Sequence, residues 1–524
     1  MKRNLFWNIV SVLIFLFLLI GEALTIATVI RLDMLPTVYL LAVIGLFAVF
    51  SLIVGLMLFL KGKKSGKGRK IAACVLAVLI VCGCAVITTV ATDVMKTLEV
   101  TSQVEEEIPT REVYVLADNT VENLADTVGY TYGYVKGYDE NCTQQVLDEV
   151  YLHTDGLVST AGYTNMFTMV NALLDNRIDA MILNGGYVSI LEDTEGLMDF
   201  SSRTKVLAQV EVDEEEDLMV DFSDPIYEEE VPEETEEATE PEETQATGDE
   251  VDYESLKPFI VYVSGSDSYN NKIVKNGRSD VNILAVVNPM TKQVLLINTP
   301  RDYYVQNTAG GGARDKLTHC GIYGTSCSMK TLGNLYDCKI EYYVRINFTG
   351  FKKLIDAMGG ITVNSDYAFT AIQRTKIKKG INELTGQEAL DFARERYTLK
   401  GGDNERGKHQ MQVITAVIQK ATSGTTIITN YSDIMASVEG MFSMNVPADM
   451  IGNLMKMQLS DMAQWNIASF AATGTGASAE CYSAPGMKLS VIKPSQSSVS
   501  KAARLIDMVY AGEILTEEVI NSIS

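Results

Sequence analysis

A stretch near the middle of the chain combines the pattern of a β-hairpin with arginine and aspartate at both of its ends. Two apolar runs, 281–287 and 294–297, are separated by a polar turn at 288–292, as expected for two paired strands. Residues that precede the first strand then lie next to residues that follow the second. The charged residues at this open end are Arg278, Asp280, Arg301 and Asp302.

These residue types indicate a site for phosphate and a metal ion. The forked guanidinium of arginine binds phosphate bidentately, and carboxylates are ligands for Mg²⁺. On this stretch alone an alternative stays open, because ion pairs on the surface at a strand end would produce the same pattern.

A second group of arginines follows a predicted helix. Thr385, with Glu388 three residues later, forms the capping-box pattern of a helix N-terminus. Arg394 and Arg396 lie two apart at the end of that helix, so they point the same way if the chain is extended there. Because apolar residues directly precede them, ordinary surface charge explains them poorly.

The next predicted helix, 404–421, adds Arg406 and Gln410, which are four residues apart and therefore share one face. Lys408 on the same helix fits ordinary surface charge. A cluster of arginines requires an anionic partner, and phosphate is the simplest one.

Transfer of a phosphoryl group requires neutralised phosphate oxygens and an oriented hydroxyl nucleophile. The arginines and a metal ion would supply the first requirement. A carboxylate close to the arginines would supply the second, and Asp302 and Asp403 are the candidates. Asp403 lies nearer to the 404–421 helix.

Strands and helices alternate around these residues, which indicates an α/β domain with a mainly buried sheet. Asp267 comes just after the first strand. Besides the hairpin, the predicted strands are 259–263, 340–346 and 361–363, and the predicted helices include 328–335 and 350–358.

The N-terminal part of the chain is predicted to cross a membrane. Three apolar runs, 5–26, 40–60 and 71–90, each have about the twenty residues that a bilayer requires. The basic segment 61–70 lies between the second and third runs. By the positive-inside rule the N-terminus and this segment are cytoplasmic, so everything after about residue 95 is extracytoplasmic. The protein is therefore expected to be a multi-pass plasma-membrane protein.

Two further regions separate the membrane segments from the arginine-bearing domain. Residues 112–212 read as a small α/β domain without a catalytic signature, so we interpret it as an accessory domain. Residues 211–254 carry twenty-two acidic residues and no Lys or Arg, which predicts an extended, disordered linker. This segment supplies most of the formal net charge of −24. The predicted divisions are a membrane anchor at 1–95, an accessory domain at 100–212, a linker at 213–256, a catalytic core at 257–424 and its C-terminal part at 425–524.

The chain resembles the LytR–CpsA–Psr family of cell-wall glycopolymer transferases. The motifs that carry the resemblance occur in the same order over about residues 259–420. They are Gly277–Asp280, Thr299–Asp302, Lys316–His319, Tyr342–Phe348, Asp356–Ile361, Leu384–Leu390, Arg394–Arg396 and Arg406–Gln410. Three spans followed by an accessory domain are similar to the capsule-attaching branch of the family. His409 departs from the amide or basic residue that members often carry there.

The resemblance implies an α/β/α domain with a central mixed sheet that binds a polyprenyl (undecaprenyl) pyrophosphate and transfers its phosphoglycan to a peptidoglycan hydroxyl. The implied cofactor is Mg²⁺ or Mn²⁺, held by Asp267 and Asp280. The polymer could be capsule, teichoic acid or another wall polysaccharide. The residues implied to bind pyrophosphate are Arg278, Arg301, Arg394, Arg396, Arg406 and Gln410.

Three alternatives to a transferase remain. A non-catalytic binder of lipid-linked glycopolymer would not need a pair of metal-binding carboxylates. A regulatory protein of the same family fits poorly with an extracytoplasmic domain, and no motif for nucleic-acid binding is present. A pyrophosphatase that uses water in place of the acceptor would require the same site, so the sequence leaves this alternative open.

Overall fold

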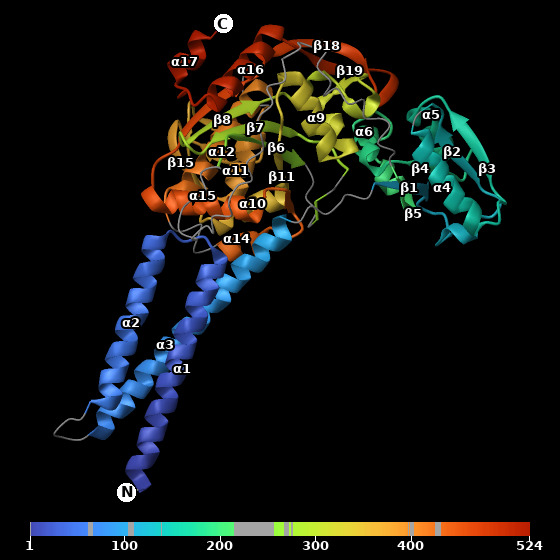
Figure 1. Cartoon of the computed structure of the whole chain (residues 1–524). Coiled ribbons are helices and arrows are strands. Elements are labelled where there is room, and N and C mark those ends of the chain that lie inside the picture. Colours follow the sequence, from blue (N-terminus) through green and yellow to red (C-terminus); the bar gives the residue numbers. More distant parts are fainter. Residues whose placement is uncertain are drawn as a thin grey trace, which may run out of the picture.

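The computed structural model describes residues 2–60, 66–102, 109–137, 139–213, 256–266, 272–273, 276–396, 398, 403–424 and 431–523. Three long N-terminal helices lie against one side of a large α/β domain, and a smaller α/β domain lies beside the large one (Figure 1). Along the chain the smaller domain comes directly after the helices. We call residues 109–213 the accessory domain and residues 256–523 the main domain. Nearly all of the predicted acidic linker, and Asp267, lie outside the described residues.

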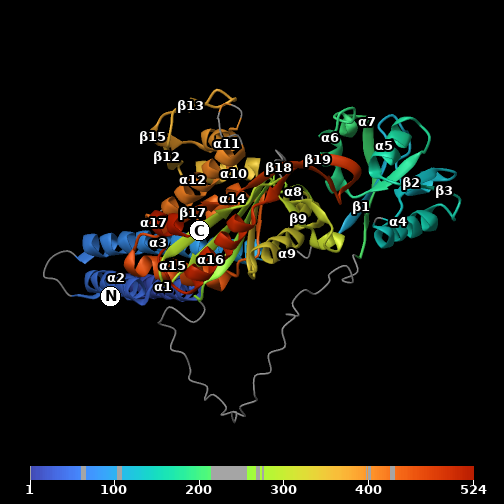
Figure 2. The same ribbon diagram turned by 90° about the horizontal axis from the view of Figure 1, so that it is seen from above.

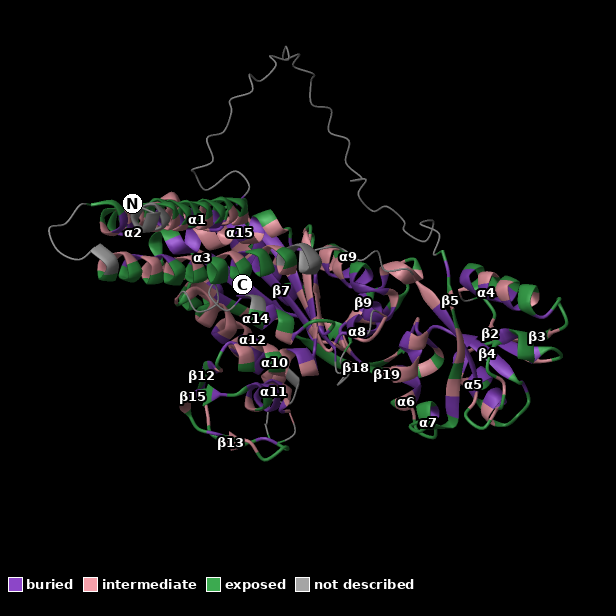
Figure 3. Cartoon of the chain, turned by 90° about the horizontal axis from the view of Figure 1, so that it is seen from below, coloured by how far each residue is buried: buried purple, intermediate pink, exposed green. Residues whose placement is uncertain are grey.

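The three predicted membrane spans are confirmed as long apolar helices. The segments apolar enough to cross a membrane are Trp7–Leu32, Thr37–Phe59 and Gly68–Thr97. Their outward surfaces carry many exposed side chains, in contrast to the buried sheet of the main domain (Figure 3). The helices themselves are α1 (Lys2–Leu32), α2 (Thr37–Phe59) and α3 (Gly66–Ser102).

The main domain rests directly on the ends of these helices. Met34 and Val94 form one buried apolar cluster with Tyr431 of helix α14 (Tyr431–Ser437). Asp33 also pairs with Lys456 at 2.6 Å. Helix α3 continues to Ser102, past the predicted end of the anchor at residue 95, so Val94 makes this contact from within a continuous helix.

The accessory domain is built on a five-stranded sheet in the order β3-β2-β4-β1-β5. Helices α4 and α5 pack on it through two apolar clusters. The strands are β1 (Thr110–Leu116), β2 (Thr131–Val135), β3 (Ser159–Tyr163), β4 (Ala180–Leu183) and β5 (Thr204–Glu211). The helices are α4 (Glu140–His153), α5 (Met166–Leu174), α6 (Val188–Glu192) and α7 (Phe200–Arg203), with short 3₁₀ turns η1 (Leu124–Thr127) and η2 (Gly185–Tyr187).

A six-stranded mixed sheet forms the centre of the main domain, in the order β16-β11-β6-β7-β8-β17. β6, β7 and β8 are antiparallel neighbours, whereas β11 and β17 join parallel to β6 and β8. The predicted hairpin is confirmed as β7 and β8. The strands are β6 (Phe259–Ser266), β7 (Val281–Asn288), β8 (Gln293–Asn298), β11 (Tyr342–Asn347), β16 (Phe442–Met444) and β17 (Asn466–Ala471).

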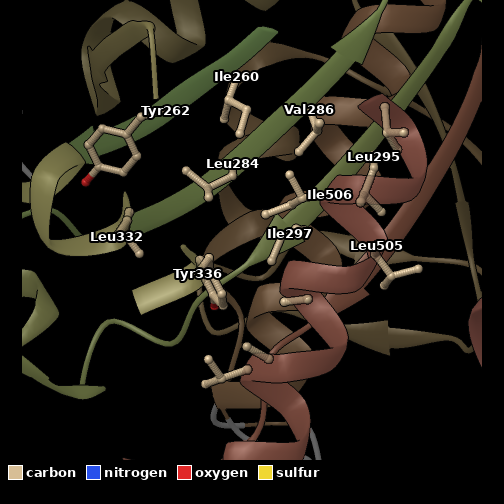
Figure 4. Close-up of a cluster of buried hydrophobic side chains, with 14 of the residues drawn as sticks. Ile260, Tyr262, Leu284, Val286, Leu295, Ile297, Leu332, Tyr336, Leu505 and Ile506 are labelled. Atoms are coloured by element: carbon tan, nitrogen blue, oxygen red, sulfur yellow. The ribbon is translucent and has the colours of Figure 1, made fainter. Parts of the chain in front are cut away.

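Alternate residues of the hairpin face two different helical layers, because successive side chains of a strand point to opposite faces. Leu284 and Ile297 pack with Leu505 of helix α16 (Gln496–Tyr510) on one face (Figure 4). Ile283 and Leu296 pack with Met411 of helix α12 (Asp403–Thr422) on the other face. The domain is therefore an α/β/α sandwich whose sheet is buried on both faces, as predicted.

The remaining elements cover the sheet or extend from its edges (Figure 2). The helices are α8 (Leu317–Cys320), α9 (Thr325–Tyr336), α10 (Phe348–Ala357), α11 (Gly386–Arg394), α12 (Asp403–Thr422), α15 (Ala448–Asp461), α16 (Gln496–Tyr510) and α17 (Glu517–Ser522), with 3₁₀ turns η4 (Thr308–Gly310) and η5 (Gly321–Tyr323). The strands are β9 (Tyr304–Gln306), β10 (Arg314–Lys316), β12 (Ile361–Ser365), β13 (Phe369–Thr370), β14 (Lys376–Ile377), β15 (Gly380–Leu384), β18 (Gly474–Cys481) and β19 (Ala484–Pro494).

Candidate active site

One pocket gathers most of the residues singled out in the sequence. It lies where β6, β7 and β11 meet helices α10, α11 and α12. Its volume of about 320 Å³ falls in the range of roughly 300–1,000 Å³ that is typical of small-molecule sites. The predicted residues that line it are Arg278, Asp280, Arg301, Arg394, Arg396, Arg406 and Gln410.

The open end of the hairpin brings Arg301 and Asp280 together as predicted. An Arg301 Nη1 atom donates to Asp280 Oδ1 at 2.6 Å, and the two side chains are 20% and 14% exposed. The backbone of both segments is held by helix α8, since Thr318 N–H donates to the Arg301 carbonyl and Ser279 N–H donates to the Thr318 carbonyl. The positions of these charged side chains are thus set by main-chain hydrogen bonds.

The carboxyl group of Asp280 stays ionised because of its arginine neighbours. Burial alone would raise its pKa, but the positive charges of Arg301, Arg278 and Arg406 outweigh this effect and lower the pKa below its usual value. As the pH falls, the negative charge at Asp280 therefore persists further into the acid range than that of a free aspartate.

The end of α11 places two arginines in the pocket. The capping box of Thr385 and Glu388 starts the helix as predicted. At its C-terminus the chain becomes extended at Glu395, and Arg394 and Arg396 both line the pocket. The guanidinium of Arg394 also lies 4.3 Å from the ring centroid of Phe348, a cation–π contact that orients it.

Helix α12 contributes Arg406 and Gln410 from one face, as their spacing predicted. The helix comes very close to the end of β8 at Gly407, where a Cβ atom would lie 2.3 Å from the Asn298 side chain. On the opposite side His409 is stacked on Phe392, with ring centroids 4.1 Å apart, and its Nδ1 lies 3.0 Å from the Phe392 carbonyl oxygen. His409 therefore has a packing role.

Most other residues that line the pocket are apolar. They come from the sheet and from all three adjacent helices, so the arginines lie next to a hydrophobic surface. Examples are Val263, Ile346, Phe351, Leu390, Val413 and Ile414.

Three predicted residues are not placed in the pocket by the described part of the chain. Asp302 pairs with Lys316 Nζ at 3.1 Å, and its carboxylate lies 3.9 Å from Arg301 Nε. Asp403 begins α12, but its side chain lies outside the described residues, as does Asp267. Their roles as base or metal ligand stay predictions.

Arg345 supports the pocket without being one of its lining residues, and it was not singled out in the sequence. It is only 2% exposed, and it donates to the Gly277 carbonyl at 2.8 Å and to Thr325 Oγ1 at 3.3 Å. It thereby holds the segment that carries Arg278. A lone arginine inside the apolar strand 342–347 was the signal that could have identified it.

Asp193 of the accessory domain also lines the pocket, where it forms an ion pair with Arg278. No sequence signal marked this residue, because the contact joins two domains that are separated along the chain. The pocket is therefore built from both domains.

The donor set of the pocket is compatible with a phosphate-bound Mg²⁺. Within the described ranges, no three His, Cys, Asp or Glu side chains form a metal-binding group. Mg²⁺ at phosphate sites, however, is commonly held by one or two carboxylates together with phosphate oxygens. Asp280, ionised and facing the arginines, can supply one of these ligands.

The model of the LytR_cpsA_psr family matches residues 227–497, more than half of the chain.

Two relatives show the extent of the similarity. One is the polyisoprenyl-teichoic acid–peptidoglycan teichoic acid transferase TagU of Enterococcus faecalis, 37% identical over 190 residues, which cover 36% of this chain and 62% of the relative. The protein of the same name from Bacillus subtilis is 34% identical over 201 residues, covering 38% of this chain and 64% of that protein. The chain thus spans less than two thirds of the length of either relative.

Solved structures also match about half of the chain. The crystal structure of B. subtilis TagU has 27% sequence identity and a TM-score of 0.39, covering 50% of this chain and 100% of that one. The crystal structure of B. subtilis TagV has 24% identity and a TM-score of 0.41, covering 50% and 99% respectively.

Proposed function

The chain belongs to the LytR_cpsA_psr family, and we propose that it transfers a glycopolymer phosphate from a polyprenyl pyrophosphate to a peptidoglycan hydroxyl. The observation that carries this proposal is a single pocket in which five arginines and Asp280 lie beside an apolar lining. The names of the relatives, which are transferases of teichoic acid to peptidoglycan, support the same reaction class.

In the proposed reaction the acceptor hydroxyl oxygen attacks the phosphorus that carries the glycopolymer. The bond between this phosphorus and the bridging oxygen of the pyrophosphate breaks, so polyprenyl phosphate leaves and a phosphodiester forms. The hydroxyl proton passes to a carboxylate or to water, with Asp302 and Asp403 as the proposed carboxylates. No further energy source is needed, because one phosphoanhydride bond is broken for each phosphodiester formed.

The arginines bind the phosphate oxygens and stabilise the negative charge that develops on them during this step. Arg301 and Arg278 approach from the hairpin, whereas Arg394, Arg396 and Arg406 approach from α11 and α12. Packed helices and strands and main-chain hydrogen bonds hold these arginines in place. They can therefore stabilise the transition state without reorganising during the reaction. Gln410 adds an amide donor beside them.

The apolar part of the lining suits the polyprenyl chain of the donor. Burying hydrocarbon against Phe351, Leu390 and Ile414 gains roughly 25 cal/mol per Å² of apolar surface. The main domain also rests on the membrane helices. The pocket therefore lies close to the membrane in which the lipid part of the donor is anchored.

We propose Mg²⁺, or Mn²⁺, as the metal, with Asp280 and Asp267 as its protein ligands. When bound, the metal would neutralise part of the pyrophosphate charge. We expect Asp280→Asn to lower the transfer rate and to weaken its dependence on Mg²⁺, because a neutral amide is a poor ligand for a hard cation. The measurement is the transfer rate across a Mg²⁺ titration. An unchanged Mg²⁺ dependence in the folded variant would exclude Asp280 as a ligand.

We further propose that both domains are extracytoplasmic. Support comes from the basic segment 61–70 between the second and third spans. A topology reporter fused after residue 95 should report an extracytoplasmic position, and one fused at Gly66 a cytoplasmic position. The reverse pattern would contradict the proposed reaction, because peptidoglycan lies outside the membrane.

The full reaction can be tested with the detergent-solubilised protein, lipid-linked oligosaccharide and peptidoglycan oligomers. Mass spectrometry should detect a product in which oligosaccharide and peptidoglycan are joined by a phosphodiester. Release of oligosaccharide phosphate without transfer would identify the protein as a pyrophosphatase instead.

A further inference from the structure

The accessory domain docks against the main domain (Figure 1), and its residue Asp193 lines the pocket. Turn η2 of the accessory domain contacts turn η5 of the main domain. Tyr187 and Tyr323 form a hydroxyl–hydroxyl hydrogen bond of 2.5 Å, and their rings are edge to face with centroids 6.3 Å apart. Ile322, which is fully buried, packs within the apolar cluster of the accessory domain.

The close approach of turn η2 to the main domain depends on Gly186. A Cβ atom at this position would lie 2.6 Å from Ile322 Cγ2 and 2.8 Å from the Asn276 carbonyl oxygen. Asn276 begins the segment that leads to Arg278, so the docked turn lies directly against the backbone of this segment. The docking is therefore specific rather than a loose contact between two surfaces.

Helix α6 follows this docked turn and ends beside the pocket. Asp193, the residue after the helix, pairs with Arg278 and lines the pocket. The side chain of Arg278 is only 11% exposed, whereas that of Asp193 is 62% exposed. An accessory-domain carboxylate thus approaches a pocket arginine from the solvent side.

Two carboxylates, those of Asp280 and Asp193, lie near Arg278, and breaking their ion pairs with arginine has a different free-energy cost for each. Asp280 is 14% exposed and is bonded to Arg301, so removing its partners would leave a largely buried charge. The Asp193 side chain is 62% exposed, so its carboxylate can move into water at little cost, and Arg278 then pairs with the incoming phosphate instead. When a pyrophosphate competes for Arg278, Asp193 is the carboxylate that can yield.

We infer that Asp193 is an exchangeable counter-ion of Arg278 that the pyrophosphate of the donor displaces. The accessory domain thereby lowers the affinity of the pocket for the donor by a small factor, because the pyrophosphate has to displace the resident carboxylate. This inference rests on the proposed function, in that it takes a pyrophosphate as the ligand of the arginines.

The test compares binding of farnesyl pyrophosphate to the full-length protein and its variants by titration calorimetry. Asp193→Asn should lower the dissociation constant about two- to fivefold, the range expected from loss of a weak competing ion pair whose carboxylate is exposed. The gain should shrink as salt is raised, because exposed charges are screened. Asp199→Asn is the matched control, since Asp199 is 61% exposed in the same domain but pairs with Arg203.

A second pair of variants separates a local contact from a general charge effect. In the Arg278→Ala background, Asp193→Asn should have no more effect than Asp199→Asn, because the contact is already lost. An equal gain in both backgrounds would overturn the inference, and so would unchanged or weaker binding by Asp193→Asn alone. If the wild-type protein binds farnesyl pyrophosphate, either of these results overturns only the role of Asp193 and leaves the proposed function standing. If neither the wild type nor any variant binds it, the role of Asp193 and the proposed function are both overturned.

Discussion

Replacing Arg301 by lysine is expected to reduce glycopolymer transfer on the order of 10²–10³-fold, nearly as much as replacing it by alanine. Arg301 donates to Asp280 at 2.6 Å and lines the pocket, so its planar fork can contact a carboxylate and a phosphate together. The ammonium of lysine is a point charge without this geometry. The measurement is the initial rate of phosphodiester formation, with circular dichroism to confirm that each variant is folded.

The matched control is Arg504→Lys, an identical change at an exposed position on α16, which should leave the rate unchanged. If a folded Arg301→Ala protein kept the wild-type rate, the open end of the hairpin would not be the active site. Combining Arg301→Ala with Asp280→Asn should give less than the product of the two separate losses, because both residues act on the same phosphate.

Phe392→Ala should lower the free energy of unfolding of the main domain by about 3–5 kcal/mol, as for other buried phenylalanines. Phe392 is fully buried on α11. Its ring stacks on His409 of α12, with centroids 4.1 Å apart, and on Phe369 at 5.8 Å. Its loss would therefore leave a cavity between the two helices that carry Arg394 and Arg406.

Urea unfolding of this variant can be followed by the fluorescence of Trp465, in a protein whose membrane-helix Trp7 is replaced by Phe. Ile372→Ala provides the control, because Ile372 is 60% exposed in the same region and should change stability by no more than about 0.5 kcal/mol. A loss as small for Phe392→Ala as for this control would show that the aromatic stack does not hold the helices together.

The local features of this protein follow from patterns of neighbouring residues. The alternation of β7 and β8 with a polar turn between them, the capping box of α11 and the three apolar spans all appear in short windows of sequence. Each is governed by interactions within a few residues or with the solvent. The convergence of Arg301 and Asp280 also followed, because a hairpin brings the residues before and after it together.

The spacing of residues at the end of α11 and on α12 was also informative, because it too depends only on local backbone geometry. Arg406 and Gln410 share a face of one helix, and Arg394 and Arg396 share a side of an extended segment. That these two pairs reach the same pocket as the hairpin depended on how the elements pack. The family resemblance supplied this expectation where local periodicity could not.

Only the tertiary structure decided which distant segments complete the sheet and the pocket. β17 pairs with β8 although more than 160 residues separate them in the chain. Arg345 supports the Arg278 segment from strand β11, and Asp193 reaches Arg278 from another domain. These contacts arise from complementary surfaces that meet after the elements have formed, and no local pattern in the sequence records which surface will meet which.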